Sequence, residues 1–211
     1  MMNRRNFSYA VSSTLLLAPF TPSAHAAAAV VGQNALDFSA LDATGKAYKL
    51  SDFKGKFVVL EWVNPGCPFV RKHYRGDKTG NMQTLQKEFT GKGVVWLSVN
   101  STEEQSFDYL APAKLSAWVN EEQASPSATL IDESGKIGQL YGAKTTPHMY
   151  IVNPQGQLAY AGAIDSIASS RVDDIKTATN YVRQGLSEAL AGKAISVSAS
   201  RPYGCSVKYK A

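Results

Sequence analysis

One apolar segment that breaks just before a cysteine constrains the fold of this chain most. Residues Phe57–Val63 are almost all apolar, with Glu61 as the one acid, and such a run is typical of a strand buried on both faces. The Asn64–Gly66 tripeptide interrupts this run. Cys67 and Pro68 follow, and proline suits the first turn of a helix, where its missing N–H costs nothing. We therefore expect a buried strand, a short loop and a helix that begins beside Cys67.

The rest of the chain alternates between strand and helix patterns. The predicted strands are 94–99, 128–131, 149–153 and 157–161, and the predicted helices include 81–89, a brief helix ending at Gly142, and 175–190. A capping box at Thr102–Gln105 predicts a further helix, which Pro112 restarts toward Trp118. Such alternation, followed by an antiparallel hairpin and a final helix, predicts one α/β domain with a central mixed sheet flanked by helices. An N-terminal hairpin within 35–50 precedes it, and a tail over 194–211 follows it.

The first 26 residues have the pattern of a secretory signal peptide. A basic start with Arg4 and Arg5 precedes an apolar stretch at Ala10–Phe20 and a small-x-small site that ends at Ala26. We therefore expect cleavage after residue 26, a single domain over 27–211, and a periplasmic or otherwise exported protein. The paired arginines fit both a twin-arginine signal and the basic end of an ordinary Sec signal. The apolar stretch is too short for a membrane span.

Charge and cysteine content narrow the range of functions. Without the leader, 20 basic residues face 17 acidic ones, because two of the 22 basic residues lie in it, and the remaining lysines are scattered. Nucleic-acid binding would need a concentrated basic face, so we expect none. Two cysteines are too few for a four-cysteine zinc site. The chain shows no glycine-rich dinucleotide turn, and we expect no metal, flavin or nicotinamide cofactor.

Cys67 is the candidate nucleophile. A cysteine at the start of a helix faces unpaired backbone N–H groups and the positive end of the helix dipole, and both favour the reactive thiolate. Arg71 stands one turn further on and would add positive charge if it turned back toward the sulfur, with Lys72 and His73 as alternatives.

Three segments carry a family resemblance. Val58–Trp62 leading to Cys67–Val70 resembles the active-site segment of thioredoxin-fold redox proteins, and Thr145–His148 resembles their cis-proline loop. The chain over 30–211 resembles the redoxins, the alkyl hydroperoxide reductase and thiol-specific antioxidant superfamily. Within that superfamily, a bacterial peroxiredoxin-like group is similar to this chain at Asn64–Tyr74, at the cis-proline loop and at the terminal segment Tyr203–Tyr209.

This resemblance implies a thioredoxin-like fold and an antioxidant thiol chemistry. Cys67 would attack a peroxide or a protein disulfide, Cys205 would resolve the product, and an external thiol protein would supply electrons. Glu61 stands where thioredoxins carry a buried acid that handles protons. The resemblance also implies that Thr146 and Pro147 shape the site.

The chain departs from the family pattern at two positions. Val70 stands where a thioredoxin has its second cysteine, and Asn64 stands where a typical peroxiredoxin has the threonine that holds peroxide. The Asn64 amide both donates and accepts hydrogen bonds, so we expect it, with Arg71, to orient substrate. The cis-proline loop would bring His148 near Cys67.

Other interpretations of the same residues remain open. Cys67 and Cys205 could form a permanent disulfide that ties the tail to a non-catalytic binding protein. Cys67 and His148 could instead bind copper, as in exported thioredoxin-fold copper carriers. Glu61 could be a buried acid paired with a lysine such as Lys56 rather than a proton carrier.

Overall fold

A computed structural model describes residues 28–74 and 80–210 of the chain. The leader expected at 1–26, with its paired arginines, lies outside the described residues. Within the described residues no helix is long and apolar enough to cross a membrane.

A five-stranded mixed sheet organises the fold, in the order β5-β4-β3-β7-β8. Its strands are β3 (Val58–Trp62), β4 (Val95–Asn100), β5 (Ala128–Ile131), β7 (His148–Val152) and β8 (Leu158–Gly162). Strands β3, β4 and β5 are parallel, whereas β7 runs antiparallel to β3 and β8 antiparallel to β7. The parallel strands are joined by helices and the antiparallel pair by a short hairpin, so the α/β architecture expected from the sequence is confirmed.

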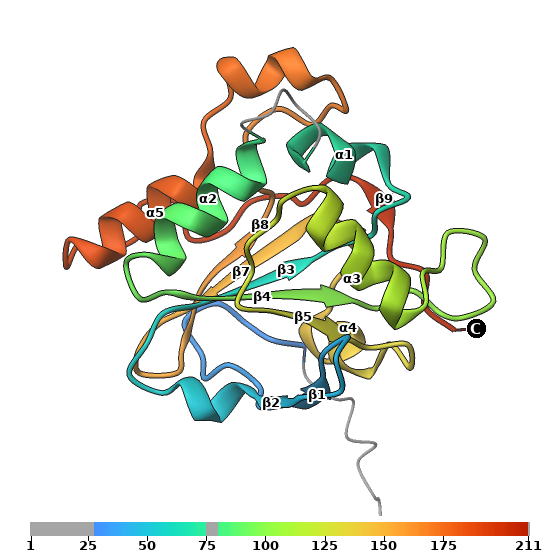
Figure 1. The fold of residues 1–211 in the computed structure, drawn as a ribbon. Coiled ribbons are helices and arrows are strands. Elements are labelled where there is room, and N and C mark those ends of the chain that lie inside the picture. Colours follow the sequence, from blue (N-terminus) through green and yellow to red (C-terminus); the bar gives the residue numbers. More distant parts are fainter. Residues whose placement is uncertain (1–27, 75–79, 211) are drawn as a thin grey trace, which may run out of the picture.

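Helices and a small hairpin cover opposite faces of this sheet (Figure 1). The larger layer comprises α1 (Pro68–Tyr74), α2 (Asn81–Thr90), α3 (Pro112–Glu121) and α5 (Tyr181–Leu190). The other face packs against the hairpin β1 (Ser39–Leu41) and β2 (Ala47–Lys49), the 3-10 helix η1 (Leu50–Phe53), and α4 (Lys136–Tyr141). A second 3-10 helix, η2 (Val172–Lys176), precedes α5. Burial on both faces explains why β3 and β4 are apolar almost throughout.

The expected helix at Thr102–Gln105 is wrong. That segment forms turns, and α3 begins at Pro112. The Thr102 hydroxyl accepts a bond from the side chain of Asn64 at 3.2 Å. The Glu103 N–H donates to the Lys208 carbonyl at 3.0 Å, so tertiary partners take the groups that a helix cap would have used.

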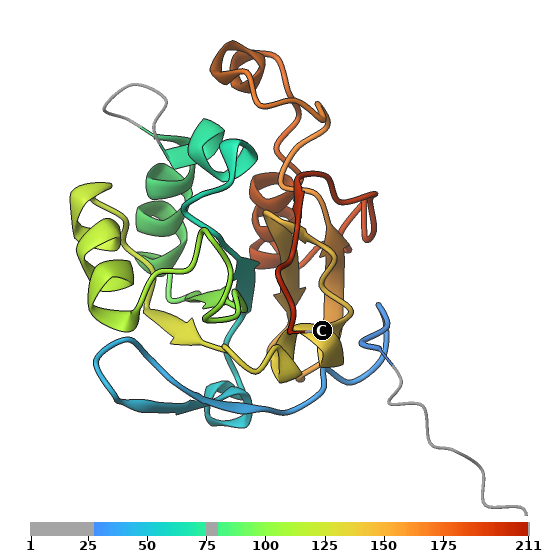
Figure 2. The ribbon, with the colours of Figure 1, turned by 90° about the vertical axis from the view of Figure 1, so that its right-hand side faces the viewer.

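The C-terminal tail returns to the body of the domain, as Figure 2 shows in red. Its strand β9 (Cys205–Ser206) pairs antiparallel with β6 (Thr145–Thr146), and Cys205 lies opposite Thr146. Further along, the Val207 N–H donates to Lys144 O, and the Tyr209 hydroxyl donates to Ala143 O at 2.7 Å. The tail is therefore fastened along the loop that leads into β7.

Candidate active site

Cys67 lies in the loop between β3 and α1, directly before the first residue of the helix. Its N–H donates to the Asn64 carbonyl, and its own carbonyl accepts from Val70 and Arg71 in the first turn of the helix. The Cys67 Sγ donates to the Thr146 carbonyl at 3.1 Å, and the residue is only 2% exposed. The sequence placed this cysteine correctly at the helix start.

The loop before β7 supplies the other wall of the site. The peptide bond between Thr146 and Pro147 is cis, as the sequence pattern indicated. Thr146 presents its carbonyl to Cys67, while its own hydroxyl is buried without a hydrogen-bond partner in the described part of the chain. Thr146 thus contacts Cys67 Sγ through its carbonyl and keeps a buried hydroxyl that is open to a hydrogen bond.

Cys205 reaches the same loop from the far end of the chain. It is half-buried and packs against the core cluster that contains Cys67. Burial, then a hydrogen bond with Cys67 and the nearby charge of Cys67, raises the pKa of the Cys205 thiol to about 12. The preceding Gly204 has φ +136°, and a Cβ there would come within 2.1 Å of the Thr146 carbonyl oxygen. Only glycine permits this approach, which brings the two cysteines together.

Asn64 is engaged inside the loop before Cys67. Its side-chain oxygen accepts from the Gly66 N–H at 2.7 Å, and its amide nitrogen donates to Asp108 at 2.8 Å and to Thr102. Asn64 is 3% exposed. Its side chain therefore shapes the loop that carries Cys67, with both amide ends already bonded.

Arg71 and Pro68 lie on the outer side of the helix start. Arg71 is exposed, and its Nε donates to the Pro65 carbonyl at 3.0 Å. This bond fastens the loop to α1. Pro68, also exposed, is the first residue of α1, where the sequence placed it.

Glu61 is a fully buried acid surrounded by neutral donors. The Tyr74 hydroxyl donates to it at 2.6 Å and the Trp96 indole at 2.7 Å. Ser98 and Gln86 donate to it as well. Burial raises the pKa of Glu61 above its ordinary value, against the four hydrogen bonds, which lower it.

The pairing of Glu61 with Lys56 is not what the structure shows. Lys56 is exposed and lines a cavity at the start of β3. The hydrogen-bond partners of Glu61 come from α1, α2 and β4 instead.

Glu61→Gln is expected to change how stability depends on pH. A carboxyl group whose folded pKa is raised stabilises the fold below its unfolded pKa, about 4.3, and loses that contribution as pH rises through the folded value. The wild-type free energy of unfolding should therefore fall relative to the variant as pH rises from about 4 toward 8. Urea unfolding of both proteins across this range measures the difference. The buried histidines titrate in both proteins, so their contributions cancel in the comparison. A difference in the free energy of unfolding that stays constant with pH would contradict the prediction.

His148 lies on the opposite face of the sheet from the cysteine. It pairs with Trp62 across β3 and β7, and its ring packs on Tyr150 with 4.5 Å between centroids. Its Nδ1 accepts from the Lys144 N–H at 3.3 Å and contacts the Tyr150 hydroxyl at 3.1 Å. Burial, followed by the charge of Lys144, lowers the pKa of His148 to about 4.

Strand alternation explains this placement, because successive side chains point to opposite faces. Met149 packs in the cluster that contains Cys67, and His148 points the other way. The expectation that the loop turns His148 toward Cys67 is therefore wrong. Among the described residues, no group of three or more His, Cys, Asp or Glu side chains could hold a metal ion.

A buried charged cluster behind α1 was not singled out from the sequence. Lys72 bonds Asp165 at 3.1 Å, with side chains only 0% and 2% exposed. The Tyr203 hydroxyl donates to the same carboxylate at 2.5 Å, and His73 Nε2 lies 3.4 Å from that hydroxyl. Burial lowers the pKa of His73 to about 4, with the charge of Asp165 acting against this shift and the charge of Lys72 adding to it. The only sign of this cluster in the sequence is that Lys72 lies close to Cys67. Its partner Asp165 lies 93 residues further along the chain, so no local pattern links the two.

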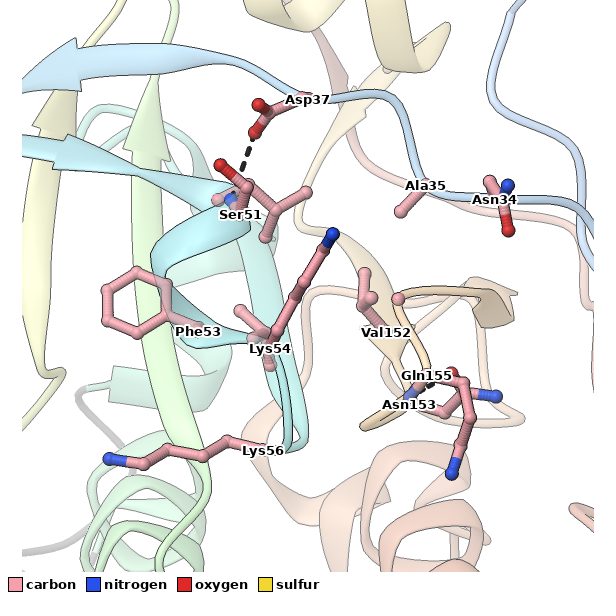
Figure 3. Close-up of a pocket in the computed structure, with 13 residues that line it drawn as sticks. Asn34, Ala35, Asp37, Ser51, Phe53, Lys54, Lys56, Val152, Asn153 and Gln155 are labelled. Atoms are coloured by element: carbon pink, nitrogen blue, oxygen red, sulfur yellow. Dashed lines mark hydrogen bonds between the residues drawn. The ribbon is translucent and has the colours of Figure 1, made fainter.

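One cavity lies away from the cysteines. It has a volume of about 270 Å³ and is lined by residues at the start of β3 and the end of β7, including Val58 and Val152. Figure 3 shows the Lys54 side chain reaching across the space between Ser51 and Val152. Cys67 follows the other end of β3, so this cavity is separate from the thiol site. No cysteine or histidine lines it.

Solved structures of other proteins share this fold. A hypothetical protein from Sinorhizobium meliloti 1021 is 24% identical, with 88% of this chain and 97% of that chain covered and a TM-score of 0.72. An uncharacterized conserved protein from Geobacillus kaustophilus is 22% identical, with coverages of 86% and 93% and a TM-score of 0.67. The thioredoxin domain of a thiol-disulfide oxidoreductase from Bacteroides vulgatus is 19% identical, with coverages of 70% and 96% and a TM-score of 0.50. These likenesses establish a thioredoxin-like fold.

Sequence comparison assigns the family. No curated protein matches the chain. The AhpC/TSA family, however, matches residues 31–161, which is more than half of the chain and includes Cys67 and the cis-proline loop. The chain belongs to the AhpC/TSA family of thioredoxin-fold proteins.

Proposed function

We propose that this protein is an exported thiol-dependent oxidoreductase of the redoxin type, with Cys67 as nucleophile and Cys205 as resolving cysteine. One observation carries the proposal. The tail strand holds Cys205 opposite Thr146, and the Thr146 carbonyl accepts the hydrogen bond from Cys67 Sγ. Two thiols from distant parts of the chain thus meet at one loop. A Cys67–Cys205 disulfide that only stabilised the fold would not need to lie at the start of a helix.

The chemistry follows from these two sulfurs. With a peroxide, the Cys67 thiolate forms an S–O bond as the O–O bond breaks, and the leaving oxygen takes a proton to become an alcohol or water. Cys205 then attacks the sulfenic acid, water leaves and a disulfide forms. With a disulfide substrate, Cys67 attacks one sulfur, the substrate S–S bond breaks, and the other sulfur leaves as a thiol. Cys205 then attacks Cys67 Sγ of the mixed disulfide, and the second substrate thiol leaves. In both routes an external dithiol protein returns two electrons.

Burial selects the sulfur that the electron donor attacks. Cys67 is 2% exposed, whereas Cys205 is only half-buried. The donor thiolate therefore attacks Cys205 Sγ, and Cys67 is the leaving sulfur.

The remaining site residues support these sulfurs in the proposed mechanism. Thr146 and Pro147 form the wall beside Cys67, and the buried Thr146 hydroxyl is available to a substrate oxygen or sulfur. Asn64 and Arg71 hold the loop before Cys67, and Glu61, buried in β3 six residues earlier in the chain, takes up and releases protons. The signal pattern of the first 26 residues supports export into an oxidising compartment, where such a pair is able to cross-link.

The reduction potential of the Cys67–Cys205 pair tests the proposal. Thiol counting and peptide mapping across graded glutathione buffers should show the bond opening near about −200 mV, as expected of a working redox pair. A potential well below about −300 mV would instead identify an inert structural bond and defeat the enzymatic proposal. Wild type compared with Cys205→Ser provides the control, because the single-cysteine protein cannot form the bond.

A further inference from the structure

Tyr203 anchors the tail two residues before Cys205. Its ring packs edge-on against Phe69 of α1, with 5.9 Å between centroids, and Lys72 Nζ lies 5.4 Å from the ring centre. Both contacts come from the helix that begins after Cys67. The anchor therefore ties the tail to the element that carries the nucleophile.

The hydroxyl of Tyr203 ends in a buried ionic cluster. It donates to Asp165 Oδ1 at 2.5 Å and accepts from Lys72 Nζ at 3.3 Å. His73 Nε2 lies at 3.4 Å and completes the ring of polar groups around it. The side chains of Lys72 and Asp165 are almost entirely buried, and the hydrogen bonds of this hydroxyl to them are charge-assisted.

The Tyr203 anchor limits the position of Cys205 because Cys205 follows only two residues later in the chain. Two residues span at most about 7 Å when extended, so fixing Tyr203 confines Cys205 to a small volume. Downstream, the Val207 N–H and the Glu103–Lys208 backbone bond fasten the tail from the other side. Upstream, backbone and side-chain hydrogen bonds of Ser200 also hold the tail, and Tyr203 is the last side-chain anchor before Cys205.

We propose that Tyr203 is a positioning residue that sets the effective concentration of Cys205 at Cys67, and so the stability of the disulfide between them. This inference rests on the proposed redox function. An intramolecular thiol held in place outcompetes external thiols in proportion to its effective concentration. Releasing the anchor lets Cys205 leave the site and favours the reduced pair.

Tyr203→Phe is the test, because it keeps the ring and removes only the hydroxyl. Asp165 retains Lys72 and the Ile167 N–H, so the variant should fold. We expect the equilibrium constant for forming the disulfide from glutathione disulfide to fall about tenfold, which corresponds to a rise of about 30 mV in the potential of the pair. Tyr109→Phe is the matched control, since its hydroxyl also donates to a carboxylate, Glu133, at 2.5 Å, but outside the tail.

A second measurement tests whether Tyr203 holds the tail, without depending on any redox equilibrium. In the Cys67→Ser background, iodoacetamide should alkylate Cys205 several times faster when Tyr203→Phe is added, because a released tail exposes its thiol. Unchanged rate and equilibrium constant in the Tyr203 variant, or an equal change in Tyr109→Phe, would overturn the anchor. A wild-type disulfide that fails to open in glutathione overturns the proposed function instead, and the alkylation rates then decide the anchor alone.

Discussion

Cys67→Ser is expected to abolish turnover with peroxide and disulfide substrates, leaving less than about one part in 10³ of the wild-type rate. The serine hydroxyl stays protonated at the helix start and cannot form the sulfenic acid or the mixed disulfide. Cys205 should not substitute, because it lies in the tail strand rather than at a helix start, and burial still raises the pKa of its thiol in this variant. Coupled assays with hydrogen peroxide, an organic hydroperoxide and an oxidised peptide measure this loss.

Cys205→Ser is the matched comparison. It should still consume one equivalent of oxidant per Cys67 thiol, because the first attack does not need the resolving cysteine. Turnover should stop there, with Cys67 held as a sulfenic acid or mixed disulfide that mass spectrometry detects. Sustained turnover by Cys67→Ser, or no reaction of Cys205→Ser at Cys67, would contradict the assigned roles.

Lys72→Met is expected to produce the largest loss of stability among the charged residues described. It removes one partner of a buried ion pair and leaves the Asp165 carboxylate desolvated, at a cost of about 3–5 kcal/mol. Two further bonds to Asp165 remain, from Tyr203 and Ile167, so the variant should still fold at low temperature. Urea unfolding of the reduced protein measures the change without a contribution from a disulfide.

Lys92→Met provides the contrast. The Lys92 side chain is 50% exposed in its pair with Glu88, so its removal should cost no more than about 1 kcal/mol. Replacing both buried partners, Lys72→Met with Asp165→Leu, should recover most of the lost stability, because no unpaired charge remains. A Lys72→Met cost equal to that of Lys92→Met would show that the buried pair does not stabilise the fold.

The sequence determined the elements around Cys67. An apolar run, a loop breaker and a proline after the cysteine act through neighbours within a few residues, and such local signals place β3 and the start of α1. The resemblance added the cis bond at Pro147 and the return of Cys205 to the body of the domain. That Cys205 is the resolving cysteine stays a prediction.

Local signals failed where distant groups compete for the same atoms. The Thr102 hydroxyl suits a helix cap, yet the Asn64 amide, 38 residues earlier, takes it and the helix does not form. His148 was expected beside Cys67 because it follows Pro147 directly. The face it points to depends on the register between β3 and β7, which pairs it with Trp62.

Tertiary structure alone decided how the tail is held. The Tyr203 hydroxyl meets Lys72 from 131 residues away and Asp165 from 38, and no periodicity links these positions. Each polar residue is compatible with solvent when taken singly, and only packing removes the water and forces the charges to pair. The amino-acid sequence therefore determined the position of Cys67 and the start of its helix, because those depend on neighbouring residues. The folded chain decided which groups surround the second cysteine, because burial and long-range pairing exist only after folding.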